Sequence, residues 1–442
     1  MRAVIVVVAL LGAARAQALA DDAKPLVGVR VRGDSKTTNE TAMRLARVSL
    51  GDPISVDMLP ELQAALLSSE LFKSVTVWLE EAPGGVIIVA TLEDKWSWVA
   101  APTLYLLPDN WSVGVGYAEN NLFGQDKKLL LYGQVGNINS LFFGTYLDPA
   151  FRATKLQLRF DIYFVRRLIQ EYVNDPAQPT DYAIARETLW TFADLGVLFG
   201  WRFYWWLSAD TRLKPGYSQF SQFTTRPERD GWDTSVQTRL TVDHRQHRYG
   251  VTWGPYAQLI TDVSVPGLSD YNYQVAAARA YYSWRFFPED PHAAGFLGRF
   301  GREHQLEFRT SLGIGHHLPL HEELTLGGVI DLRGYPVDMF RGDRRAAGRA
   351  EYSMQLAKWW MFSFRAIGFF DAGYVGFHAR DTQTREYLPT QLGDAHWIRS
   401  DVGGGVRIYV GNVVLPLLGL DYAYGLEGER HEVYFEIGLT DF

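Results

Sequence analysis

Residue types that catalyse reactions or bind metals are present in this chain, but their spacing fits neither role. His244 and His247 are three residues apart, which suits one face of a helix better than a strand, and His321-Glu322 lacks the second histidine of a zinc-protease motif. The chain has no cysteine, no Gly-x-Ser-x-Gly turn and no phosphate-binding loop. We therefore predict that the protein is not an enzyme and has no catalytic residue, metal site or cofactor.

Two short motifs carry residues suited to a different kind of chemistry, the formation of an ion pair. Arg333 stands in Arg333-Gly334-Tyr335, and Asp371 stands in the motif Phe-x-Asp-x-Gly that begins at Phe369. A guanidinium can fork onto a carboxylate with two directional, charge-assisted hydrogen bonds. Such a pair anchors one segment to another and catalyses nothing. The alternative interpretation is that Arg333 lies in an ordinary solvated loop.

The elements that would position these motifs are β-strands, because apolar and polar residues alternate from Trp96 onward. The clearest run has apolar residues at every second position: Leu156, Leu158, Phe160, Ile162 and Phe164. Parity also puts Asp371 on the polar face of its strand, opposite Phe370 and Tyr374. A soluble sheet and a barrel in lipid share this alternation, but no helical segment remains to cover so large a sheet. Closure into a transmembrane barrel removes its edges.

The first twenty residues have the pattern of a secretory signal peptide. Arg2 is the positive start, Ala3–Ala14 form an apolar core, and Ala18-Leu19-Ala20 offer a small-residue cleavage site. Removal of this segment also removes Arg2 and Arg15, which changes the formal net charge from −7 to −9. We therefore expect an exported protein that does not bind nucleic acid.

Residues 21–95 predict a compact α/β domain. An alternating strand at Val27–Val31 is followed by a helix from a Thr37–Glu40 capping box to about Val48. Gly51-Asp52-Pro53 ends that helix, and a second helix then has Leu59, Leu62 and Leu66 on one face. Two further strands follow, at Val75–Leu79 and Val86–Glu93. This β-α-α-β-β order resembles a single POTRA domain, and the alternative is an unrelated small α/β domain.

The two motifs together resemble those of the BamA/TamA superfamily of outer-membrane assembly proteins. The resemblance implies a mostly β fold, a sixteen-stranded antiparallel barrel, and residues 96–442 allow about 22 residues for each strand with its hairpin. It also implies that the long sixth outer loop, about 317–347 here, folds into the lumen. There Arg333 would pair with Asp371 of the wall motif Phe369–Gly373, with Glu351 as a second acid, while Tyr335 packs nearby and Gly334 permits close approach.

Smaller matches support the same resemblance. Asn121–Gln125 is similar to the first periplasmic turn of the family, and Asp148-Pro149 is similar to the end of its fourth strand. The final strand resembles the family's carboxy-terminal signal, which would here consist of Phe435, Ile437 and Phe442. Phe442 departs from that pattern because it is out of phase with the other two. A bulge would be needed to bring it to their face.

By this resemblance, the protein would insert or help to assemble β-barrel proteins in the bacterial outer membrane, with its POTRA domain in the periplasm. Its partners would be the lipid bilayer, extended client proteins and accessory periplasmic proteins. The clients would add to the sheet edge at Val75, Val77 and Leu79. The chain departs from family patterns by having one POTRA domain and no plug helix, so a dedicated two-partner translocation pore and a passive or structural channel remain alternatives.

Overall fold

The structure is a computed structural model, and it describes residues 23–106, 110–175, 178–221, 229–248, 251–286, 302–359, 362–378, 398–410, 416–427 and 430–437. The predicted signal peptide lies outside these residues. The chain divides into two compact units, one of which holds the chain up to Lys95 with Phe123–Gln125, and the other the remainder. Among the described residues, no helix is both long and apolar enough to cross a membrane.

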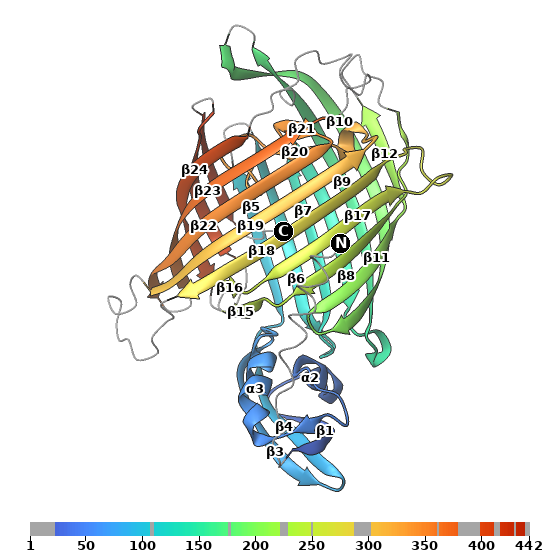
Figure 1. Ribbon diagram of the computed structural model, residues 1–442, viewed down its shortest axis with the longest axis vertical. Coiled ribbons are helices and arrows are strands. Elements are labelled where there is room, and N and C mark those ends of the chain that lie inside the picture. The colour runs from blue at the N-terminus through green and yellow to red at the C-terminus, as the bar shows by residue number, and fades with distance from the viewer. Residues whose placement is uncertain are drawn as a thin grey trace, which may run out of the picture. The chain divides into compact units, whose positions relative to one another are not determined.

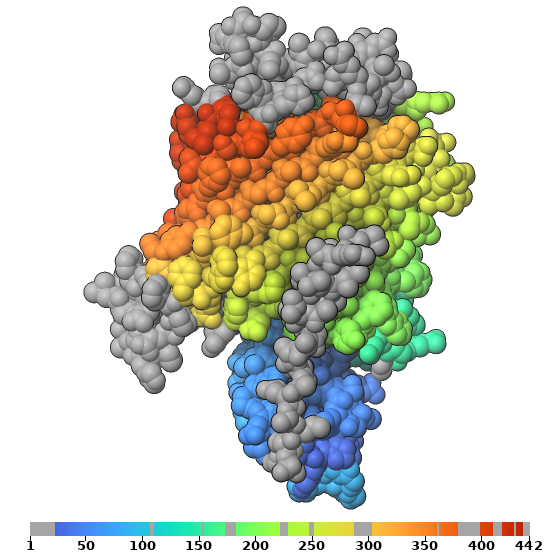
Figure 2. Space-filling view, in the orientation of Figure 1, coloured from blue at the N-terminus to red at the C-terminus, as the bar shows by residue number. Residues whose placement is uncertain are grey.

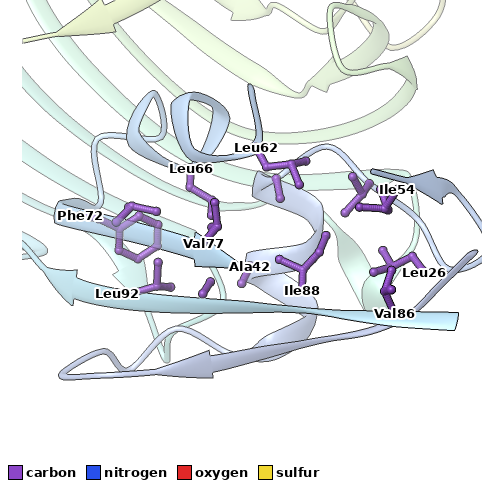
Figure 3. Packing of buried hydrophobic residues seen from close by; sticks show 14 of the residues in the cluster. Leu26, Ala42, Ile54, Leu62, Leu66, Phe72, Val77, Val86, Ile88 and Leu92 are labelled. Carbon is purple, nitrogen blue, oxygen red and sulfur yellow. The ribbon is translucent and has the colours of Figure 1, made fainter. Parts of the chain in front are cut away.

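The smaller unit is an α/β domain with a four-stranded sheet. Its elements are β1 (Lys24–Arg32), α2 (Asn39–Leu45), β2 (Pro53–Ile54), η2 (Val56–Met58), α3 (Leu59–Leu67), β3 (Phe72–Ala82) and β4 (Gly85–Asp94). The sheet order is β2-β1-β4-β3, in which β1 and β4 are parallel and β3 lies at one edge. Both helices pack their apolar faces on the sheet, and Leu62, Leu66, Val77 and Ile88 meet in the core (Figure 3).

Three details of this domain differ from the expectations. The cap of α2 is Thr38, whose hydroxyl accepts from the Thr41 N–H, so the predicted Thr37–Glu40 box is wrong by one residue. The helix also ends at Leu45 instead of Val48, because Arg47 adopts a left-handed conformation with φ of 64°. The short strand β2 was not predicted, since two residues are too few to show an alternating pattern.

The larger unit is a closed antiparallel β-barrel, as predicted (Figure 1). It has sixteen strands, two of which are each interrupted once and so carry two labels. The strands are β5 (Trp98–Leu106), β6 (Trp111–Leu122), β7 (Lys127–Gly136), β8 (Asn139–Asp148), β9 (Leu156–Asp175), β10 (Gln178–Tyr204), β11/β12 (Leu207–Lys214 and Gly216–Ser221), β13/β14 (Gly231–Trp232 and Ser235–Asp243), β17 (Tyr256–Ser264), β18 (Gln274–Phe286), β19 (Arg302–His316), β22 (Arg344–Trp359), β23 (Phe362–Gly376), β24 (Arg399–Val410), β25 (Pro416–Gly425) and β26 (Arg430–Ile437). Asp148 ends the fourth of them.

Alternation along the strands separates an apolar outer face from a polar lumen. On β9, Phe160, Ile162 and Phe164 are 45–47% exposed, whereas Asp161 between them is buried. On β23, Phe370 is likewise exposed and Asp371 is fully buried. The outer surfaces of β18, β19, β22 and β23 form one continuous wall in Figure 2. This is the arrangement that lipid on one side and enclosed polar groups on the other require.

A long segment between β19 and β22 lies inside the barrel. It contains η4 (Leu320–Glu322) and a small hairpin of β20 (Leu324–Leu326) with β21 (Phe340–Gly342), near one rim (Figure 1). The segment ends at Asp343, four residues before the predicted end, because Arg344–Ala347 pair with both β19 and β23. We call residues 317–343 the lumenal loop. A second small sheet, β15 (Gln246–Arg248) with β16 (Val251–Trp253), lies near the other rim.

Candidate functional site: the anchor of the lumenal loop

The centre of the site is the side chain of Arg333, which the lumenal loop presents to the barrel wall. Its Nε and Nη2 donate to Asp371 Oδ2 and Oδ1 at 2.8 and 3.0 Å, a bidentate pair. Both side chains are almost fully buried, at 1% and 0% exposure. A buried pair of this geometry is costly to break, because either partner left alone would be an uncompensated charge. The structure therefore brings together the two residues of the predicted ion pair.

A second acid and an aromatic ring complete the surroundings of the guanidinium. Arg333 Nη1 donates to Glu351 Oε2 at 2.7 Å, so the return strand β22 supplies the second acid, as the resemblance implies. The ring of Phe369 lies under the guanidinium, with its centroid 3.3 Å from the Arg333 Cζ. Asp421 of β25 approaches Nη1 to 3.8 Å. Each nitrogen of the guanidinium thus donates to a carboxylate, and its flat face meets the electron-rich face of a ring.

The two residues after Arg333 attach the loop to the last strands of the barrel. The Gly334 N–H donates to Asp401 Oδ2 of β24 at 2.9 Å. A Cβ at position 334 would lie 2.6 Å from the Gly425 backbone nitrogen, so only glycine permits this approach. The Tyr335 hydroxyl donates to Glu427 Oε2 at 2.6 Å, and its oxygen lies 3.2 Å from the Ser400 carbonyl oxygen. Burial raises the pKa of this hydroxyl, and the bond to Glu427 raises it further, so it stays protonated.

The remaining residues of the wall motif give the loop room to pack. Gly373 lies beneath Leu326, since a Cβ there would come within 2.9 Å of the Leu326 side chain. Gly403 of β24 plays the same part for Phe369, whose ring would be 2.3 Å from such a Cβ. Both glycines face the lumen, and the large side chains above them are buried. The motif Phe-x-Asp-x-Gly therefore provides a ring, a charge and a gap on one face of β23.

The loop is also docked on the opposite part of the wall. Leu320 is fully buried with Val165, Ile169 and Trp190 of β9 and β10. Arg167 of β9 pairs with Asp338 of the loop. The loop therefore connects strands early in the barrel with strands β22–β25, and it can leave the lumen only by breaking both sets of contacts.

The predicted client edge and carboxy-terminal signal lie elsewhere. Val75, Val77 and Leu79 belong to the edge strand β3, but their side chains point into the domain core, so only the backbone of β3 is offered at the edge. Phe435 shares the outer face of β26 with Val433, while Tyr434 is buried on the lumenal face. Ile437 is the last residue of β26. Phe442 lies outside the described residues.

Several residues of the anchor were missed by the sequence analysis: Asp401, Asp421, Glu427, Arg349 and Arg407. Arg349 Nε donates to Asp371 Oδ1 at 3.2 Å, and Arg407 forms a bidentate pair with Asp421. Parity on β22, β24 and β25 could have put most of them in the lumen, as it did for Asp371. Their register against Asp371 could not be read from one sequence, because it depends on hairpin lengths.

Comparison with known proteins identifies the family of this chain. The model of the Omp85 superfamily domain matches residues 121–440. This chain belongs to the Omp85 superfamily. That result confirms the family-level resemblance, and an Omp85 barrel of this kind lies in an outer membrane and works with client proteins. No curated protein sequence is significantly similar to the chain.

Solved structures share the Omp85 fold over nearly the whole chain. BamA from Haemophilus ducreyi lacking POTRA domains 1–3 matches with a TM-score of 0.59 and 14% identity, over 93% of this chain and 84% of that one. CdiB from Acinetobacter baumannii matches with 0.61 and 15%, over 94% and 74%. CdiB from Escherichia coli matches with 0.63 and 11%, over 93% and 76%. These similarities establish the fold. They do not distinguish a role like that of BamA from a role like that of CdiB.

Proposed function

We propose that this Omp85 protein inserts β-barrel clients into the outer membrane through the junction of its first and last strands. The observation that carries the proposal is the direct pairing of the first strand, β5, with the last strand, β26, which closes the barrel. In the described residues, these strands pair at Phe435–Leu106, Glu436–Tyr105 and Ile437–Leu104. Because no hairpin joins the first strand to the last, they can part by breaking backbone hydrogen bonds alone, and an open edge can template a client strand.

The N-terminal domain would act as the periplasmic receiver of extended clients. We propose that it is a POTRA domain and that a client strand pairs with the backbone of β3. The Val75 carbonyl already accepts from Gln63 Nε2 of α3 at 2.8 Å. A client must therefore displace Gln63 or pair further along β3, towards Trp78 and Glu80. Accessory periplasmic proteins could use the same edge.

The anchored loop has a structural part in this proposal. Its contacts with β22–β25 hold the strands beside the junction in register while the junction itself opens. We propose no catalytic activity for the protein, since insertion needs only strand exchange and the folding free energy of the client.

The decisive test locks the junction with a disulfide, which is clean in a chain without native cysteine. Leu106 and Phe435 are direct partners across the junction, and Leu106 and Trp111 are partners within the first hairpin. The protein carrying Leu106→Cys and Phe435→Cys, in liposomes, should lose insertion of a denatured β-barrel substrate and regain it on reduction. Leu106→Cys with Trp111→Cys is the matched control and should remain active when oxidised. Full insertion by the oxidised junction variant would refute the proposal.

A dedicated translocation pore for one exported partner is the second candidate, and a lumenal cavity favours it. The loop and wall border an open space of about 650 Å³, lined by Val329–Asp331 and by wall residues such as Arg279, Arg309 and Glu307. A pore would need the loop to move out of this lumen. Planar-bilayer recordings separate the candidates: steady conductance without any partner indicates a passive channel, and conductance that appears only with a partner protein indicates the translocation pore.

A further inference from the structure

A histidine and two acids meet where the lumenal loop touches the barrel wall, away from the arginine anchor. Asp233 lies between β13 and β14 on the wall, and His321 and Glu322 lie in η4 of the loop. One nitrogen or carboxylate oxygen from each comes within 4.8 Å of the other two. An ion with bonds of about 2.1 Å separates two tetrahedral ligands by about 3.4 Å, so side chains at this distance reach one ion after small rotations. Asp233 and His321 are 88 residues apart, so sequence spacing could not reveal the cluster.

The His321 side chain is buried, and only one of its two ring nitrogens has a hydrogen-bond partner among the described residues. Its side chain is 0% exposed, and its ring lies 5.0–5.4 Å from the rings of Trp190, Phe220 and Tyr271. Nε2 contacts Asp233 Oδ2 at 2.8 Å, but Nδ1 is buried and has no hydrogen-bond partner in the described part of the chain. A neutral imidazole that donates from one nitrogen keeps a lone pair on the other. A buried lone pair without a donor is costly, and metal-bound histidines commonly hold a carboxylate on their other nitrogen.

The groups around the cluster carry more negative than positive charge. Glu322 interacts with Asp233 and Asp262, which share its sign, and with Lys214 and His321. Lys214 is already paired with Asp262, whose Oδ1 is buried without a partner among the described residues. Three carboxylates therefore face one permanent cation.

We propose that His321, through Nδ1, and the Glu322 carboxylate bind one divalent transition-metal ion, of the class represented by Zn²⁺, while Asp233 holds the ring in place through Nε2. One imidazole nitrogen with carboxylate oxygens is a donor set that such ions accept. Two positive charges would balance the two excess carboxylates. Because Asp233 belongs to the wall and the two ligands belong to the loop, an ion at Nδ1 would strengthen the hydrogen bond from Nε2 to Asp233. The ion would thereby help to fasten the start of the loop to the barrel, independently of Arg333.

The test uses the full-length protein in detergent, stripped with a chelator and then dialysed against Zn²⁺. Wild-type protein should retain one Zn²⁺ per chain by elemental analysis, and His321→Gln should bind it at least about tenfold more weakly. His317→Gln is the matched control, because His317 lies in the same loop but is exposed, and it should bind as wild type does. Equal retention by wild type and His321→Gln, or no retention by wild type, would overturn the proposal.

A second readout separates metal binding from a purely structural histidine. Zn²⁺ should slow proteolysis of the loop in wild type and in His317→Gln, and chelator should restore the faster cleavage. In His321→Gln and Asp233→Asn, cleavage should be fast whether or not Zn²⁺ is present, while the unboiled barrel still migrates as a folded species. If low pH protects the wild-type loop and Zn²⁺ does not, then a protonated His321 is the balancing cation and the metal proposal is wrong.

Discussion

Asp371 and Asp401 lie directly opposite each other on β23 and β24, and each binds a different part of the same loop. Asp371 accepts the guanidinium of Arg333, and Asp401 accepts the N–H of the next residue, Gly334. Two buried carboxylates side by side repel each other unless cations and donors face them. The loop supplies both, in the guanidinium of Arg333 and the N–H of Gly334. The two wall carboxylates therefore hold the loop in the lumen.

Replacement of Arg333 by Ala should release the loop and leave the barrel intact. Asp371 would lose two hydrogen bonds at a cost of about 1–3 kcal/mol, reduced by the bond that Arg349 still makes to it. The loop should be cleaved faster by external protease, while the barrel still migrates faster on a gel before boiling than after. Asp371→Asn should reproduce much of the defect, and the double variant should cost less than the sum of the single ones. Strictly additive costs would contradict a direct pair.

Substitution of Gly334 by Ala should disturb the anchor as strongly, for a steric reason. The added methyl group would lie 2.6 Å from the Gly425 nitrogen and 2.7 Å from the Asp401 Cβ, so the loop must retreat. Overpacking of this kind costs about 1–3 kcal/mol. Gly348→Ala on β22 is the control, since a Cβ there meets nothing within 4 Å. Equal protease sensitivity of the two variants would show that Gly334 is not in close contact with β25.

Removal of the Tyr335 hydroxyl should weaken docking in a pH-dependent way. Tyr335→Phe loses the contacts with Glu427 and Ser400, at about 0.5–1.5 kcal/mol. The folded pKa of this hydroxyl is raised, so its contribution is present below the unfolded pKa of about 10 and declines as the pH rises above it. Loop protection in wild type and Tyr335→Phe should therefore differ at pH 8, and the difference should shrink progressively as the pH rises beyond about 10 towards the raised folded pKa. A constant difference across that range would argue against a protonated hydroxyl donor.

Residues 21–95 should fold alone as a soluble domain, because their core is built within that segment. Circular dichroism of the isolated segment should show a cooperative thermal transition. Ile88→Ala should lower the free energy of unfolding by about 2–5 kcal/mol, since Ile88 is 0% exposed in the core. Val56→Ala is the control, because Val56 is 59% exposed and its loss should change little. If the isolated segment is disordered, then the predicted domain boundary near Trp96 is wrong.

Strand β23 shows how much of the site could be predicted from the sequence. Alternation alone put Asp371 on the inner face, and the family resemblance then identified its partner, because both signals depend on nearby residues. Asp401 and Glu427 are equally close to the loop, yet they were missed because strand register is set by hairpins far from Arg333. The same limit applies to Asp233 and His321, which only the closed barrel brings together. Periodicity predicts which face a residue occupies, but not which residue it will meet.

The contacts of Tyr335 also fix an order of assembly. Its partners Ser400 and Glu427 lie 65 and 92 residues away in sequence, on or beside β24 and β25. A contact of such long separation closes a large loop of chain, and the entropy lost is recovered only when both ends are held in place. The loop can therefore complete its docking only once the strands that follow it are in place. A docked loop therefore indicates that strands β24 and β25 have already been assembled into the barrel.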